Sequence, residues 1–267
     1  METKVVTIDR KLIDEELLQQ AGHIIKQGGL VAFPTETVYG LGGDALNKES
    51  SRKIYEAKGR PSDNPLIIHI CSMDDLKPIV EEIPEAVYRL AEAFWPGPLT
   101  VIMKKSALVP TETTGGLDTV AVRMPSHPVA QRFIRYAGGY VAAPSANVSG
   151  RPSPTKAKYV IEDMTGRIDM ILDGDGIDIG LESTIVDMTG ETPMILRPGY
   201  ITIDMLEKVL GEVDVYQTIL DLNCKEPPKA PGMRYRHYAP KGQLTIVEGP
   251  IDKTIENTYN KHEELMI

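Results

Sequence analysis

The sequence predicts an α/β fold built on a mixed sheet. Short apolar runs of strand length alternate with longer stretches that have the apolar spacing of helices. Several of the apolar runs follow one another with no helical stretch between them, and most end at proline or glycine. A strictly doubly wound sheet would alternate regularly, so the irregular order favours a mixed sheet.

The first half of the chain opens with a short strand at 5–8 and a helix from Glu15 to about Gln27. Asp14 can cap this helix, and Gly28-Gly29 ends it. The expected elements that follow are a strand at 30–33, a helix at 48–58, a strand at 66–70, a helix beginning at Ser72, a helix at 84–94 and a strand at 99–104.

The second half repeats short strands around fewer helices. The strand at 66–70, which precedes them, alternates poorly between apolar and polar residues, and this indicates that both of its faces are covered. The expected elements are strands at 119–125, 140–143, 168–173, 183–187 and 194–199, with helices at 127–136 and 202–210.

Two strands of this sheet end in the same way. Each has a Gly-Gly turn, an apolar run, a proline and then hydroxyl residues: Leu30–Phe33 leads into Pro34-Thr35-Glu36-Thr37, and Tyr140–Ala143 leads into Pro144-Ser145. Loops at strand ends often carry ligand contacts, so we expect these two ends to meet at one place. The alternative is two strands followed by ordinary turn residues.

Basic side chains stand at other element ends. Arg123 and Arg197 each end an apolar strand, and a buried arginine needs an anionic partner, either an internal carboxylate or a ligand. Arg60 lies among helix-breaking residues, where it either binds phosphate or is solvated. His69 interrupts an apolar strand and is either a core histidine or a ligand donor. The cluster 234–238 either stacks on RNA or closes over a nucleotide.

Composition narrows the class of protein. The net charge of −9 and a pI near 5.2 argue against a surface that binds nucleic acid throughout, though not against a local basic pocket. Cys71 and Cys224 make neither a disulfide framework nor a metal-ligand set. There is no signal-peptide pattern and no apolar run of membrane-spanning length, so we expect a soluble cytoplasmic protein without membrane contact.

The chain divides into three expected regions. Composition changes near residue 221, and 227–232 is a Pro-rich extended segment. We expect a catalytic domain at 1–211, a linker at 212–242 that closes over the site, and at 243–267 the start or remnant of a second domain, too short to fold alone.

Eight motifs in this order resemble the threonylcarbamoyl-AMP synthases of the Sua5/YrdC/YwlC family, from about residue 5 to residue 211. Residues 230–240 resemble the linker of the longer Sua5 form, but the C-terminal domain of that form is shortened here. The motifs are Pro34–Leu41, Lys58–Pro61, Asn64–Leu66, Trp95–Thr100, Val122–Pro125, Pro144–Gly150, Ser183–Asp187 and Leu196–Gly199.

The resemblance implies an L-threonylcarbamoyladenylate synthase, a nucleotidyltransferase. It would condense L-threonine, bicarbonate and ATP into threonylcarbamoyl-AMP and pyrophosphate, for t6A modification of tRNA. The implied fold is a twisted mixed sheet, YrdC-like, with surrounding helices and a concave basic face. Mg²⁺ would accompany ATP, with its protein ligands unknown, and tRNA or t6A-transfer proteins are candidate partners.

The resemblance also implies site residues. Lys58 and Arg60 would be catalytic, adding charge near the triphosphate. L-threonine would be held by Thr37, His69, Arg123, the backbone at Ala143, and Ser183. ATP would be held by Arg60, Asn64, Thr119, Ser145, Ser153, Arg197 and Arg236.

Two other functions remain open at this point. The first is a carbamoyl-transfer maturation enzyme of the hydrogenase type, although this chain has too few cysteines for the zinc fingers of those proteins. The second is a double-stranded RNA-binding module that uses a concave basic face. Dependence of turnover on threonine would separate the synthase from both.

Overall fold

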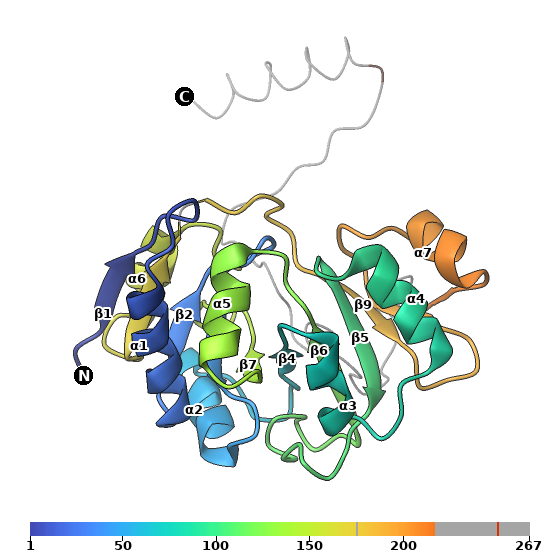
Figure 1. Cartoon of the computed structure of the whole chain (residues 1–267), viewed down its shortest axis with the longest axis horizontal. Coiled ribbons are helices and arrows are strands. Elements are labelled where there is room, and N and C mark those ends of the chain that lie inside the picture. The colour runs from blue at the N-terminus through green and yellow to red at the C-terminus, as the bar shows by residue number, and fades with distance from the viewer. Residues whose placement is uncertain (175, 217–249, 251–267) are drawn as a thin grey trace, which may run out of the picture.

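The computed structural model describes residues 1–174, 176–216 and 250, and in them eleven strands form a single sheet (Figure 1). The order across the sheet is β1 (Lys4–Thr7), β8 (Met170–Asp173), β2 (Val31–Phe33), β3 (Gly40–Asp44), β7 (Val141–Ala143), β4 (Ile67–His69), β6 (Thr119–Arg123), β5 (Leu99–Lys104), β9 (Thr184–Asp187), β10 (Met194–Arg197) and β11 (Asp214–Val215).

Parallel and antiparallel pairs are interspersed along this order. β4 pairs with β6 in parallel and with β7 in antiparallel, so the centre of the sheet already contains both arrangements. The pair β5–β9 is parallel, whereas β5–β6, β2–β3 and β3–β7 are antiparallel. The predicted mixed sheet is confirmed.

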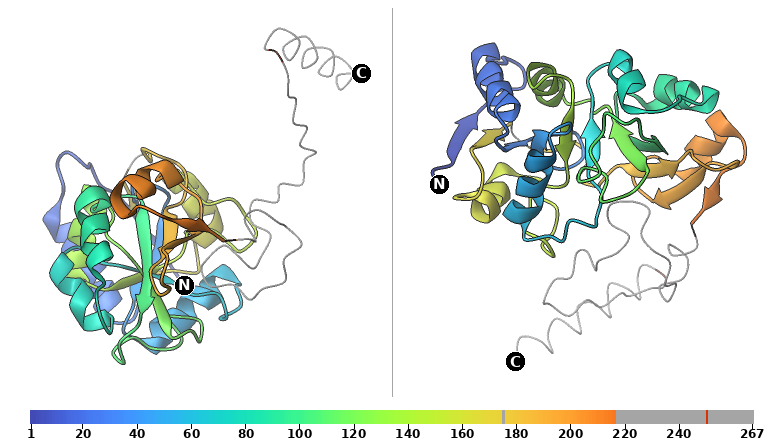
Figure 2. Two further views of the ribbon diagram at one scale, coloured as in Figure 1. Left: turned by 90° about the vertical axis from the view of Figure 1, so that its right-hand side faces the viewer. Right: turned by 90° about the horizontal axis from the view of Figure 1, so that it is seen from below.

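Helices cover the sheet from both sides (Figure 2). α1 (Glu15–Lys26) and α5 (Pro128–Tyr136) lie side by side, and α4 (Glu85–Phe94) packs with α7 (Ile203–Leu210) at the other end of the sheet (Figure 1). The remaining helices are α2 (Lys48–Lys58), the 3-10 turn η1 (Met73–Asp75) with α3 (Leu76–Ile79), and α6 (Ala157–Met164).

Burial follows the two faces of the strands. In β4, Ile68 belongs to the largest apolar cluster, which also holds side chains of α2, α4 and α6. Its neighbour Ile67 points the other way, into a smaller cluster with Ile102, Ala121 and Ile185. A third cluster joins α1 and α5 to β2, β7 and β8. Successive residues of a strand face opposite sides, so β4 is covered on both faces, as its poor alternation predicts.

The predicted positions of the other elements agree with the structure to within a few residues, but the prediction lacks β3, α6 and the short strand β11. Gly40–Asp44 forms β3, a buried strand between β2 and β7, although glycine is usually depleted in strands. Close packing explains it: a Cβ on Gly42 would lie 2.8 Å from Val141 Cγ1. The second missed element is α6, whose buried Ala157, Val160 and Met164 do have helical spacing.

Some predictions fall outside the described residues. They include Arg236, most of the expected linker and all of the expected segment 243–267 except Pro250. Within the described residues, no helix has the length and apolarity needed to cross a membrane.

Candidate active site

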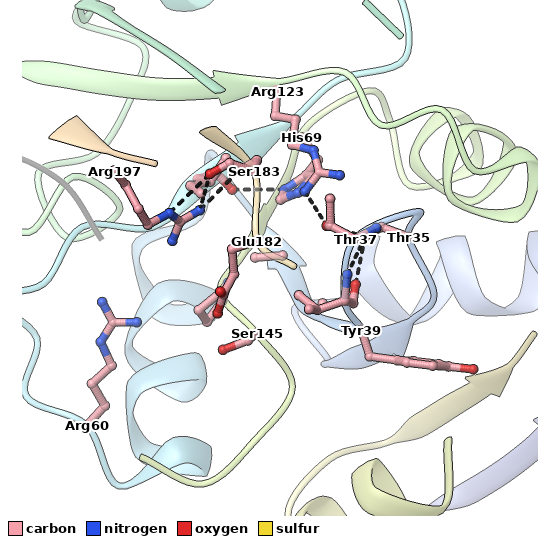
Figure 3. A pocket seen from close by; sticks show the side chains of 15 residues that line it. Thr35, Thr37, Tyr39, Arg60, His69, Arg123, Ser145, Glu182, Ser183 and Arg197 are labelled. Carbon is pink, nitrogen blue, oxygen red and sulfur yellow. Dashed lines mark hydrogen bonds between the residues drawn. The ribbon is translucent and has the colours of Figure 1, made fainter. Parts of the chain in front are cut away.

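A cavity opens where the ends of strands β2, β4, β6, β7 and β10 approach the segment before β9 (Figure 3). Its walls combine hydroxyl groups, arginines and small apolar residues. The lining residues are Thr35, Thr37, Val38, Tyr39, Gly40, Arg60, Ile67, His69, Arg123, Ala143, Pro144, Ser145, Glu182, Ser183 and Arg197.

The two similar strand ends do meet at this cavity. The amide of Leu41 donates to the carbonyl of Pro144 over 2.8 Å, and the amide of Ala146 donates to the carbonyl of Tyr39 over 2.8 Å. These bonds join the segment after β2 to the segment after β7, so Thr37 and Ser145 line the same space. The prediction that both ends deliver hydroxyl groups to one place is confirmed.

A short chain of hydrogen bonds orients the threonine hydroxyls. Thr35 Oγ1 donates to the carbonyl of Val38 over 2.6 Å, which uses its only proton. The same oxygen accepts from the amides of Thr37 and Val38 over 3.2 and 3.3 Å, and it lies 3.0 Å from Thr37 Oγ1. The Thr37 oxygen in turn accepts from Arg123 Nη1 over 2.9 Å. Thr37 Oγ1 therefore keeps a lone pair that can accept from a ligand.

Arg123 is buried and paired with an internal carboxylate. Its Nη2 lies 2.6 Å from Glu36 Oε1, with both side chains about 5% exposed or less. Glu36 Oε2 accepts from the amide of Ser126 over 3.2 Å. Of the two partners that the sequence leaves open for Arg123, the internal carboxylate is therefore present, and Arg123 still lines the cavity.

His69 is a neutral histidine at the wall of the cavity. Burial, and next the charge of Arg123, lower the pKa of its ring to about 3. Its Nδ1 lies 3.1 Å from the carbonyl of Ile67, and its ring packs edge-on against Phe33 at 5.9 Å between centroids. At neutral pH the ring adds no positive charge, which leaves the anion-binding charge to the arginines.

Arg197 and Ser183 form the opposite wall. Nε and Nη2 of Arg197 donate to the carbonyl of Ser183 over 3.1 and 2.9 Å, and Nη2 also donates to Ser183 Oγ over 3.1 Å. Ser183 Oγ lies 2.7 Å from Thr100 Oγ1. Burial lowers the pKa of Arg197 to about 10, against the opposing charge of Glu182, so the guanidinium is charged at neutral pH.

Arg60 reaches the cavity from the loop after α2, and Asn64 lies behind it. Arg60 Nη2 donates to the carbonyl of Asn64 over 3.1 Å. The Asn64 side chain is fully buried, and neither its Oδ1 nor its Nδ2 has a hydrogen-bond partner among the described residues. A buried carboxamide without partners is costly, so its position is consistent with a ligand contact.

Lys58 is a buried residue beside the cavity and not one of its lining residues. Its Nζ donates to the carbonyls of Ser145 and Asn147, the latter over 2.6 Å. Burial, and next the charge of Arg60, lower the pKa of its amine well below the usual value. Its contacts fix the loop that carries Ser145.

The other expected residues are more dispersed. Thr119 begins β6 opposite Lys104, away from the lining residues, and Ser153 Oγ donates to Glu182 Oε1 over 2.6 Å, next to the cavity. Arg236 is not described. Thr35, Glu36 and Glu182 were missed as site residues. Glu36 could have been found from its place between two threonines at a strand end, facing a predicted strand-end arginine.

The cavity is basic and suited to anions. Three arginines and one carboxylate line it, and the arginines come from three different segments of the chain. Apolar walls lower the local dielectric, so the attraction between the guanidinium groups and a bound carboxylate or phosphate is strengthened. With hydroxyls between the arginines, the arrangement defines a site for small polar anions at the strand ends of a mixed sheet.

Comparison with known proteins identifies the family to which this chain belongs. The family model described as "Telomere recombination" (Sua5, YciO and YrdC) matches residues 23–199. A second model, described as "Threonylcarbamoyl-AMP synthase, C-terminal domain", matches residues 201–266. The chain belongs to the Sua5/YciO/YrdC family.

Relatives are similar over nearly the whole chain. A threonylcarbamoyl-AMP synthase from Pyrococcus abyssi is 50% identical over 96% of this chain and 76% of its own length, and one from Bacillus subtilis is 48% identical over 99% and 77%. The crystal structure of P. abyssi Sua5 complexed with L-threonine superposes with a TM-score of 0.92 at 49% identity, covering 98% of this chain and 77% of that one. E. coli YciO shares the fold, with a TM-score of 0.69 at 22% identity over 77% of this chain and all of that one.

Proposed function

We propose that this chain is a threonylcarbamoyl-AMP synthase, a nucleotidyltransferase that supplies the t6A modification of tRNA. It condenses L-threonine, bicarbonate and ATP into threonylcarbamoyl-AMP and pyrophosphate. The observation that carries the proposal is the meeting of Arg60, Arg123 and Arg197 around one cavity, with hydroxyl groups between them. A triphosphate and an amino-acid carboxylate are the two anions that this reaction must bring together.

The threonine half of the site is assigned to the strand ends around Arg123. Arg123 would bind the carboxylate of threonine, since a guanidinium matches that group in shape and charge. Thr37 has a lone pair left to accept from the substrate, and the neutral His69, the backbone at Ala143 and Ser183 complete the wall. The similar P. abyssi Sua5 structure is a complex with L-threonine, which supports this assignment.

The ATP half is assigned to the segments that follow α2 and β7 and to the end of β10, which carries Arg197. Arg60 and Arg197 would carry the phosphates, and the carboxamide of Asn64, which has no partner among the described residues, would gain partners from the nucleotide. Ser145 and Ser153 lie near this end, and we keep Thr119 and Arg236 as further ATP contacts. Lys58 is proposed to act through the loop that it holds at Ser145.

Catalysis would come from positioning and charge. Carbamate formation and adenylyl transfer need three reactants held close, which converts a step between separate molecules into one within a complex. Arg60 and Arg197 would stabilise the negative charge that develops on the transferring phosphate. No nucleophilic side chain is required for either step.

Mg²⁺ is proposed to accompany ATP. Such an ion keeps several waters and takes phosphate oxygens with few protein ligands. Glu182 is the one carboxylate among the described lining residues, and no group of three metal-binding side chains occurs in the described part of the chain. This donor set fits an ion held mainly by the phosphates, with Glu182 as the available protein ligand.

The remaining assignments are proposals as well. The division into 1–211, 212–242 and 243–267 and a cytoplasmic location rest on the composition and patterning of the sequence. The closing of the linker over the site and contact with tRNA or t6A-transfer proteins rest on the resemblance.

Pyrophosphate release tests the proposed function. Purified protein with ATP, bicarbonate and Mg²⁺ should release pyrophosphate when L-threonine is added and not without it. Release that is independent of threonine would favour a different carbamoyl-transfer enzyme. Absence of release together with tight binding of double-stranded RNA would favour the RNA-binding module.

A further inference from the structure

Glu36 is a buried carboxylate directly behind the cavity. It is 4% exposed and is not among the lining residues. One oxygen accepts from Arg123 Nη2 over 2.6 Å, and the other accepts from the amide of Ser126 over 3.2 Å. The carboxylate is therefore fixed from two sides, by a side chain on β6 and by the backbone that follows it.

The guanidinium of Arg123 is held along its edges. Nη2 donates to Glu36, Nη1 donates to Thr37 over 2.9 Å, and Nε lies 3.4 Å from the carbonyl of Gly97. A guanidinium has five N–H donors in one plane. Within the described part of the chain, the three contacts leave one N–H on each of Nη1 and Nη2, and the directions of these N–H groups are set because the plane is fixed.

Arg123 is the cation that neutralises Glu36. His127, which follows Ser126, is 2% exposed, and neither of its ring nitrogens has a hydrogen-bond partner among the described residues. Burial lowers the pKa of His127, against the charges of Glu36 and Asp178, so this ring is neutral at pH 7. No charge from His127 competes with Arg123 for the carboxylate.

We propose that Glu36 is a positioning residue for the amino-acid substrate, which holds Arg123 so that its two remaining N–H donors point at the carboxylate of L-threonine. The inference rests on the proposed function, in which Arg123 binds that carboxylate. Glu36 touches no substrate and acts through Arg123.

Charge and positioning predict opposite results for one substitution. Glu36→Gln removes a negative charge close to the carboxylate site, so electrostatics alone would strengthen threonine binding. The same change weakens the hold on Nη2, since a bond between two charged groups is replaced by one to a neutral amide. If Glu36 acts by positioning, threonine binding weakens even though the site becomes more positive.

The test uses the full chain and the pyrophosphate assay. For Glu36→Gln we expect the KM for threonine to rise by roughly 10- to 100-fold, the range of one charge-assisted hydrogen bond, with the KM for ATP nearly unchanged. Binding of threoninol, which lacks the carboxylate, should not change. The matched control is Glu15→Gln, which removes an exposed partner of Arg132 at 2.7 Å and should change neither constant.

A double substitution distinguishes positioning of Arg123 from a general loss of structure. In an Arg123→Ala background, Glu36→Gln should cause no further loss of threonine affinity, because its effect passes through Arg123. Equal losses for threonine and ATP, additive losses in the double variant, or tighter threonine binding would overturn the inference. If Glu36→Gln does not fold, Glu36→Asp, which keeps the charge but shortens the reach, should show the same split. A wild-type protein without threonine-dependent release would instead reject the proposed function.

Discussion

Arg123 gives the most direct prediction at the scale of single residues. Arg123→Ala should weaken threonine binding by roughly 100-fold or more, because it removes a charged partner of the substrate carboxylate, and should affect ATP far less. Titration of each substrate separately measures the split. Arg197→Ala should weaken ATP binding more than threonine binding. Equal losses of threonine and ATP affinity in Arg123→Ala would mean that Arg123 only stabilises the fold.

His69 links the site to the pH dependence of stability. Its pKa is about 3 in the folded protein and near 6.5 when unfolded, so below pH 6.5 the unfolded state binds an extra proton. The contribution of His69 to the free energy of unfolding is fully present above pH 6.5. It is lost as the pH falls toward 3, by up to about 1.4 kcal/mol per pH unit. His69→Gln should flatten this part of the curve, as measured by denaturant unfolding between pH 6.5 and 4. An unchanged slope would contradict a neutral buried ring.

Single residues also show what the sequence could and could not predict. Arg123 and Arg197 were identified because charged residues are rare at the ends of apolar strands. Glu36 was missed because a carboxylate in a polar loop looks solvated until the fold brings it to Arg123, 87 residues away. The carboxamide of Asn64, without a partner in the described part of the chain, is likewise visible only from burial and contacts.

The close packing of β3 leads to a prediction about the stability of the fold. An alanine at Gly42 would place its Cβ 2.8 Å from Val141 Cγ1 and 3.1 Å from Phe33 Cε1. Gly42→Ala should therefore destabilise the fold by about 1–3 kcal/mol, the usual cost of overpacking. The measurement is the free energy of unfolding in denaturant. Gly176→Ala, where a Cβ meets nothing within 4 Å, is the control and should be neutral.

Lys58, the last residue of α2, is expected to support ATP binding through the loop at Ser145. Lys58→Met keeps the length of the side chain but leaves the carbonyls of Ser145 and Asn147 without their donor. We expect the KM for ATP to rise about tenfold or more, because the loop at Ser145 loses its support, with a smaller effect on threonine. Steady-state kinetics with each substrate varied will check this, and a larger effect on threonine would contradict it.

Elements were predictable where the pattern is local. The helix at 48–58 and the strand at 99–104 match α2 and β5 because capping, glycine termination and apolar runs are written in the sequence itself. β3 was not predictable, since glycine there is selected by the close approach of Phe33 and Val141 from other elements. α6 has a readable helical spacing, but its N-cap Lys156 makes no side-chain capping bond.

The whole molecule brings the ends of distant segments to one cavity. β2 and β7 are separated only by β3, and β4, β6 and β5 continue the sheet beyond them. This order places Thr37, Arg123 and Arg197 around the same space although they are far apart in the chain. The resemblance in eight motifs predicted the family, while the contacts inside the cavity needed the sheet order.

One measurement tests the central claim, that this cavity joins threonine, bicarbonate and ATP. The protein is incubated with ¹⁴C-bicarbonate, ATP, Mg²⁺ and L-threonine. The labelled nucleotide product is then separated and identified by mass spectrometry. We predict that the label appears in threonylcarbamoyl-AMP, in equal amount with pyrophosphate, and that it disappears when threonine is omitted. Labelled adenylate formed without threonine, or pyrophosphate released without incorporation of the label, would contradict the claim.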